Sequence, residues 1–86
     1  MKLEGSLNAA WAASSWRQQA QLFAQAEADL TEVVRLDSAG LALLVKWSQS
    51  CLARGERLRI LGADDNFLKL ASLYGVAELF DLAPLH

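Results

Sequence analysis

The chain has 86 residues, a net charge of −2 and 53% apolar side chains. That length suits a single domain over residues 1–86, with enough apolar side chains to build a small core. Its eight Lys and Arg residues are scattered, which argues against nucleic acid as a partner and against direct binding to anionic lipid. No stretch approaches the roughly 20 apolar residues of a membrane span, so we expect no membrane insertion.

The first part of the chain predicts a strand, a helix and a second strand. Leu3–Leu7 alternates between apolar and other residues, as a half-buried strand does. Asn8 is suited to cap a helix that runs from Ala9 to about Gln25, a stretch without Gly or Pro. Alternation returns over Glu27–Leu30, which predicts a short strand. Further apolar anchoring is expected from Val33, Val34 and Leu36.

The middle of the chain predicts a helix and then a strand. After Asp37, apolar and small residues recur at helical spacing, and Gly55 is placed to end the helix, with Arg54 in its last turn. Arg57–Leu61 alternates and stops at Gly62, as a strand would. The expected inner face of the helix consists of Leu41, Leu44, Val45, Ser48 and Leu52.

The last part predicts a third helix, capped by Asp64 or Asp65 and ended by Gly75. Val76–Leu82 reads as a short strand or a helical turn, and Pro84 closes the chain. Strands that alternate with helices predict an α/β fold with parallel strands, whose partners bind at the carboxyl ends of the strands. The expected shared face of the third helix consists of Phe67, Leu70, Ala71 and Tyr74.

The candidate site is the turn Asp37-Ser38-Ala39-Gly40, at one of these carboxyl ends. Ser38, at or near the N-cap, can satisfy a free helix amide. Ala39 and Gly40 are small, so the backbone can turn sharply and a partner can approach closely. A phosphate on Ser38 would be tolerated at this helix end, and it would repel a partner fitted to the neutral hydroxyl. By itself, however, such a turn is an ordinary helix cap.

The wider pattern resembles the signature of the STAS domain, a family named after sulphate transporters and anti-sigma factor antagonists. The resemblance runs from Asp29 to Leu41, and it extends to Leu3–Asn8 and Leu70–Val76. It implies a small mixed or parallel sheet with helices on one side. STAS domains usually begin with a further strand before the one that contains Gly5, so we expect the sheet edge to be uncovered or completed by another chain.

Within the family, Gly40–Leu44 and the Leu73-Tyr74-Gly75 ending look most similar to MlaB, a subunit of the bacterial Mla phospholipid-transporting ABC complex. The resemblance implies a non-catalytic cytoplasmic subunit that docks on the ATPase at the inner membrane and supports outer-membrane lipid asymmetry. The docking residues would be Asp37, Ser38, Ala39, Gly40, Leu41 and Trp16. The alternative is an anti-sigma factor antagonist, with Ser38 as the phosphoacceptor of a kinase.

Two tryptophans of the first helix, Trp11 and Trp16, are five residues apart and do not share a helical face. One is expected in the core and the other partly exposed. Trp16 is then either an interface anchor or a packing residue. Trp47 is expected to pack in the core, and Cys51, the single cysteine, to be a buried and inert thiol that fits a reducing compartment.

No residue pattern points to catalysis. The chain has no glycine-rich phosphate loop, and no nucleophile stands at a recognisable spacing from a base. Asp64 and Asp65 are expected to cap a helix rather than to bind a metal, and His86 is a poor ligand or base at the end of the chain. We therefore expect no cofactor, no metal and no enzyme activity, with a small flavodoxin-like enzyme as the weakest reading.

Overall fold

The structure is a computed structural model, and it describes residues 1–82; Pro84 and His86 lie outside the described residues. Its centre is a sheet in which the strands pair in chain order, each parallel to the next. This confirms the predicted α/β fold with parallel strands. The strands are β1 (Lys2–Leu7), β2 (Glu27–Leu36), β3 (Leu58–Leu61) and β4 (Phe80–Leu82).

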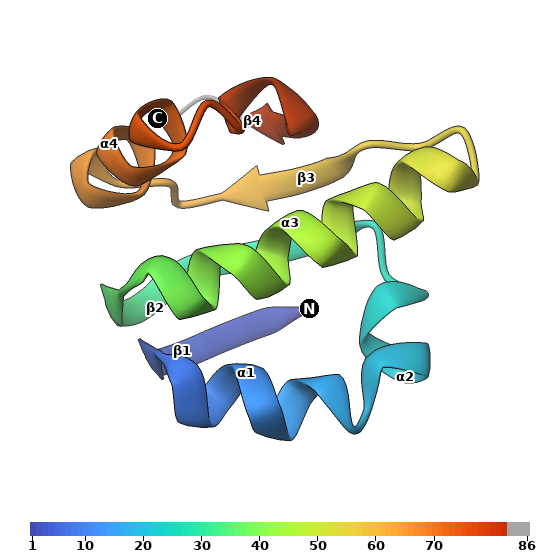
Figure 1. The fold of residues 1–86 in the computed structure, drawn as a ribbon, viewed down its shortest axis with the longest axis horizontal. Helices are drawn as coiled ribbons and strands as arrows, with labels where there is room; N and C mark the ends of the chain where they lie inside the picture. Colours follow the sequence, from blue (N-terminus) through green and yellow to red (C-terminus); the bar gives the residue numbers. More distant parts are fainter. Residues whose placement is uncertain (83–86) are drawn as a thin grey trace.

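Helices cover one face of this sheet (Figure 1). Each strand lies beside the preceding one, and crossovers between parallel strands share one hand, so successive helices return to the same side. In Figure 1, α3 crosses the middle of the molecule, in front of β2, with α1 on one side and α4 on the other. The helices are α1 (Ala9–Trp16), α2 (Gln19–Phe23), α3 (Ser38–Ala53) and α4 (Asp65–Leu73), with a short 3₁₀ turn, η1 (Ala77–Leu79), before β4.

The opposite face of the sheet is polar. Glu27, Arg59 and Asp81 lie in register on β2, β3 and β4, and all three are exposed. Charges of alternating sign on neighbouring strands keep such a face hydrated without mutual repulsion. Within residues 1–82, no helix is long and apolar enough to cross a membrane.

The predicted helix over residues 9–25 is wrong in one respect: it is broken at Arg17 and Gln18 into α1 and α2. The break lets the chain fold back so that Phe23 lies 6.0 Å from Trp16 and stacks on Trp47, measured between ring centroids. Two residues seven apart on a straight helix would be separated by about 10 Å along its axis. Packing of these aromatic rings therefore stabilises the broken helix more than a continuous helix would be stabilised in this segment, which has no long apolar stripe.

The second strand is longer than predicted, and its inward face does not alternate regularly. At two places β2 contains one residue more than β1 between successive register partners. Such β-bulges change the spacing of the inward residues, which are Ala28, Leu30, Val33 and Leu36. The expectation that Val34 anchors the core is wrong, since Val34 is 85% exposed.

The inner face of α3 is rotated from the predicted one. Trp47 and Cys51 are fully buried, as expected, and they lie at the centre of the buried stripe together with Leu44. The indole Nε1 of Trp47 donates to the Gln25 carbonyl at 2.8 Å, which fixes this side of the helix inward. Leu52, predicted to face the core, is 40% exposed in consequence.

The predicted helix caps are confirmed at both flanking helices. The side chain of Asn8 accepts from the Trp11 amide at 3.0 Å, and that of Asp64 accepts from the Phe67 amide at 2.9 Å. The helix α4 ends before Gly75, as predicted, but Tyr74 is more than half exposed instead of sharing the buried face. The segment after Gly75 contains both of the expected elements, η1 and then β4.

Candidate functional site

The turn that begins α3 is built around the carboxylate of Asp37. Asp37 has an extended backbone, and its Oδ1 accepts a hydrogen bond from the Gly40 amide at 3.0 Å. Asp37 is therefore the N-cap, and Ser38, expected at or near that position, is the first residue of the helix. The cap belongs to Asp37 because a short N-cap side chain reaches an amide two or three residues ahead, and Gly40 is three residues from Asp37.

The side chain of Ser38 is left without a structural task. Ser38 is exposed, and in the part of the chain that the structure describes its hydroxyl makes no hydrogen bond. A hydroxyl at this position can both donate and accept. It is therefore available to another molecule without breaking an interaction of the folded chain.

Gly40 is required by packing rather than by backbone conformation. Its φ is not positive, unlike that of four other glycines, and the residue is buried. A Cβ at this position would stand 2.0 Å from the carbonyl oxygen of Leu7. The start of α3 thus lies directly on the end of β1, which carries Ser38 to the surface on a rigid base.

Three hollows meet at this turn, and three consecutive residues each line a different one. Asp37 lines a cleft between β2 and the start of α4. Ser38 lines a groove between α3 and the turn that follows α4 (the α3–α4 groove), and Ala39 lines a groove between α1 and α3. Three hollows therefore come together near the carboxyl ends of the strands, where ligands of such sheets usually bind.

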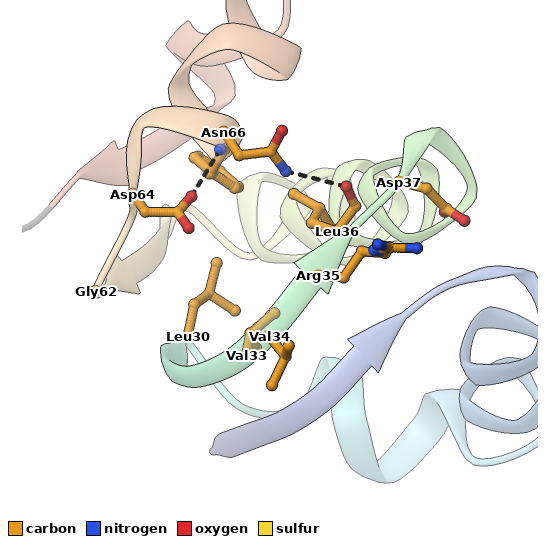
Figure 2. Close-up of a pocket in the computed structure, with 10 residues that line it drawn as sticks. Leu30, Val33, Val34, Arg35, Leu36, Asp37, Gly62, Asp64 and Asn66 are labelled. Atoms are coloured by element: carbon orange, nitrogen blue, oxygen red, sulfur yellow. Dashed lines mark hydrogen bonds between the residues drawn. The ribbon is translucent and has the colours of Figure 1, made fainter.

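Figure 2 shows the cleft and the residues that line it. It arises because β3 ends at Leu61 while β2 continues to Leu36, and it has a volume of about 340 Å³. The amide of Asn66 donates to the Leu36 carbonyl at 3.1 Å and so bridges the two walls. Asp37 and Asp64 also line the cleft, and both already cap helices. One oxygen of each carboxylate is therefore engaged in the fold, while Arg35 also lines the cleft.

The α1–α3 groove is shallow and almost wholly apolar. Its volume is about 400 Å³, and its rim carries Trp16, which is 47% exposed. The ring of Trp16 meets Phe23 edge to face, so it is held in place while one side stays open. The groove is lined by Ala12, Ala13, Trp16, Ala39, Ala42, Leu43 and Lys46.

The α3–α4 groove lies on the other side of α3. Its volume is about 380 Å³, the buried side chain of Leu41 contributes to its lining, and Tyr74 forms part of its rim. Ser38 stands at one end of it. The groove is lined by Ser38, Leu41, Ala42, Val45, Lys46, Gln49, Tyr74 and Val76.

We call the two grooves and the exposed ridge of α3 between them the α3 surface. Five of the six residues predicted for partner binding line one of the three hollows, while Gly40 lies beneath them. The sequence prediction missed several side chains that form the walls, namely the small Ala12, Ala13 and Ala42, the aromatic Tyr74 and the charged Lys46. The spacing of Ala39, Ala42 and Lys46 on the outer side of the helix was the signal available for them.

The pKa shifts of Cys51 and Asp29 have structural causes, and both groups lie outside the α3 surface. Burial raises the pKa of the Cys51 thiol, an effect that the neighbouring Arg54 guanidinium opposes. Hydrogen bonds from the hydroxyl and then from the amide of Thr31 lower the pKa of the Asp29 carboxyl. Over residues 1–82, no group of three or more His, Cys, Asp or Glu side chains is arranged to hold a metal ion.

This combination defines a class of protein. Over residues 1–82 it is a small α/β domain with four parallel strands in chain order, and an exposed, unbonded hydroxyl stands at the start of its central helix between two apolar grooves.

The comparison with models of protein families identifies the family of this chain. The family described as "Mlab, STAS domain" matches residues 1–83. The chain therefore belongs to the STAS domain family and is most like MlaB within it. A search among curated proteins finds no match for the chain.

Proposed function

We propose that this chain is the STAS subunit of a phospholipid-transporting ABC complex and that it docks on the cytoplasmic ATPase through the α3 surface. The observation that carries the proposal is the exposed, unbonded hydroxyl of Ser38 between two apolar grooves. Membership of the MlaB-like STAS family supports the choice of an ABC ATPase as the partner.

The physical argument rests on what the surface offers. Apolar grooves flanked by exposed aromatic rings provide area whose removal from water favours association. Trp16 and Tyr74 stand on opposite outer rims, and Trp and Tyr are the side chains most often found as interface anchors. Ser38 adds a hydroxyl that contributes specificity once water is excluded.

The test is co-purification with the ABC ATPase subunit of the same cell, using Ser38→Glu as the disruptive variant. A carboxylate at the first residue of a helix is favourable for folding, so loss of binding would not reflect an unfolded chain. Ser6→Glu is the matched control, because Ser6 is exposed on β1, with Arg35 as its register partner. We expect a stable complex with wild type and with Ser6→Glu, and a weak one with Ser38→Glu. A complex that Ser38→Glu leaves unchanged would remove Ser38 from the proposal.

A second candidate function is an anti-sigma factor antagonist that a kinase switches off by phosphorylating Ser38. It is favoured by the same hydroxyl, which is exposed at a helix start where phosphate is tolerated. Incubation with the cognate kinase and ATP, followed by intact mass measurement, separates the two functions. The mass of one phosphate, lost in Ser38→Ala, would favour the antagonist, and an unchanged mass with an active kinase would reject it.

A further inference from the structure

The two grooves of the α3 surface share two residues, Ala42 and Lys46. The residues lie one helical turn apart on the exposed side of α3. The helix α3 itself lies between α1 and α4 (Figure 1). Ala42 is exposed and small, so the ridge is low and the grooves join across it. A single element of a partner can therefore lie over α3 and place side chains in both grooves.

Among residues 1–82, Lys46 is the single charged residue that lines either groove. It is exposed, and the ion pairs found within residues 1–82 join Lys2 to Glu32 and Arg54 to Glu56, not Lys46 to an acid. The helix α3 contains no Asp or Glu from Ser38 to Ala53. An element that covers the ridge thus covers an ammonium group for which this surface supplies no counter-charge.

Covering an unpaired charge is unfavourable, because the ammonium group loses water and gains nothing in return. The cost is removed when the incoming surface carries a carboxylate at that point. From this charge and the two joined grooves we infer that the docking element is an apolar helix with one Asp or Glu, which pairs with Lys46 while its apolar side chains enter both grooves. The inference rests on the proposed function and names the chemistry of the ATPase segment.

A helix fits this surface better than an extended segment. The walls of both grooves are formed mainly by α1 and α3, whose inner amides and carbonyls already bond within each helix, so these helical walls offer no free backbone edge to an added strand. A helix satisfies its own backbone and presents side chains as ridges that fit between neighbouring helices.

The experiment compares three variants for binding to the purified ATPase subunit. Lys46→Glu reverses the charge, Ala42→Trp places a bulky ring on the ridge where the grooves join without changing charge, and Lys69→Glu is the matched control on the exposed side of α4. Lys46 and Lys69 are exposed helix residues, so both substitutions are compatible with folding, which circular dichroism checks. We expect Lys46→Glu to weaken binding by at least about tenfold, with Lys69→Glu close to wild type. Ala42→Trp should abolish binding.

Reversal of single carboxylates in the ATPase completes the test. One Asp→Lys or Glu→Lys change should restore the binding of Lys46→Glu and weaken that of wild type. If Ala42→Trp blocks binding but Lys46→Glu binds like wild type, docking stands and the carboxylate pairing is overturned. If both variants bind like wild type, the α3 surface is the wrong interface, and if wild type does not bind the ATPase at all, the proposed function fails together with the inference.

Discussion

Gly40 shows how one missing side chain sets the position of the candidate site. The start of α3 rests on the end of β1 at a distance that leaves no room for a Cβ, which would stand 2.0 Å from the Leu7 carbonyl oxygen. Ser38 is therefore held two residues before a fixed contact. The hydroxyl is presented by packing in the core, although it lies at the surface itself.

Gly40→Ala should destabilise the chain, although alanine is the better helix former by about 1 kcal/mol. The added methyl group forces α3 away from Leu7, and such overpacking costs about 1–3 kcal/mol or more, so the steric term wins. Urea unfolding measures the difference. Gly55→Ala is the comparison, since a Cβ there meets nothing within 4 Å and only the left-handed backbone opposes it. Wild-type stability or better in Gly40→Ala would show that the close contact is absent.

Cys51 makes stability depend on pH in a predictable direction. Burial raises its pKa in the folded chain above the ordinary thiol value. As pH rises past the ordinary value, the unfolded thiol loses its proton while the folded thiol keeps it, so unfolding releases a proton and is favoured. The stability that Cys51 provides is complete below the unfolded pKa and is lost as pH rises through the folded one.

The free energy of unfolding of wild type and Cys51→Ala, measured under reducing conditions from neutral to alkaline pH, tests this. Cys51→Ala leaves a small cavity and should be less stable at neutral pH. The advantage of wild type should shrink as pH rises, because only wild type carries the thiol. A difference that stays constant or grows with pH would contradict the raised pKa.

At the scale of elements, β2 is the strand whose structure differs most clearly from the alternation of its sequence. Two bulges against β1 change its inward spacing from every second to every third residue, so the pattern looks irregular when it is read alone. The caps and the ends of α3 and α4 could be predicted because they depend on residues within one turn. The bulges and the break after α1 could not, since they follow from pairing with β1 and from packing on Trp47.

The bulges predict opposite effects for two neighbouring apolar residues of β2. Val34→Ala should change the free energy of unfolding by less than about 0.5 kcal/mol, because Val34 is 85% exposed. Leu36→Ala should cost about 2–5 kcal/mol, because Leu36 belongs to the core. Chemical denaturation of both variants measures the contrast, and equal losses would place the two side chains on the same face.

As with the fold, one part of the candidate site could be predicted from sequence and another part could not. The turn at Asp37 and Ser38 could be predicted from sequence, because a cap and a helix start are local. The two grooves could not, since each needs side chains from segments that meet only in the folded chain, such as Trp16 with Ala42 and Tyr74 with Ala42. Sequence therefore predicted the turn through which we propose docking, and the structure supplies the shape and charge of the surface around it.

At the scale of the whole molecule, the two faces of the sheet differ in what they offer. The helix-covered face carries the joined apolar grooves and an unpaired lysine. The open face carries charges of alternating sign in register, such as Glu27 and Arg59. Association driven by apolar burial is expected on the first face and not on the second, which gives docking a definite orientation.

Oxidative footprinting by hydroxyl radicals, on the chain alone and bound to the ATPase, measures this orientation most directly. Trp16 and Tyr74 are 47% and 55% exposed on opposite rims of the α3 surface, while Leu68 and Leu73 are 40% and 76% exposed on the outer side of α4. The docking account predicts that binding protects both Trp16 and Tyr74 and leaves both leucines reactive. Protection of Leu68 and Leu73, with Trp16 and Tyr74 still reactive, would contradict it.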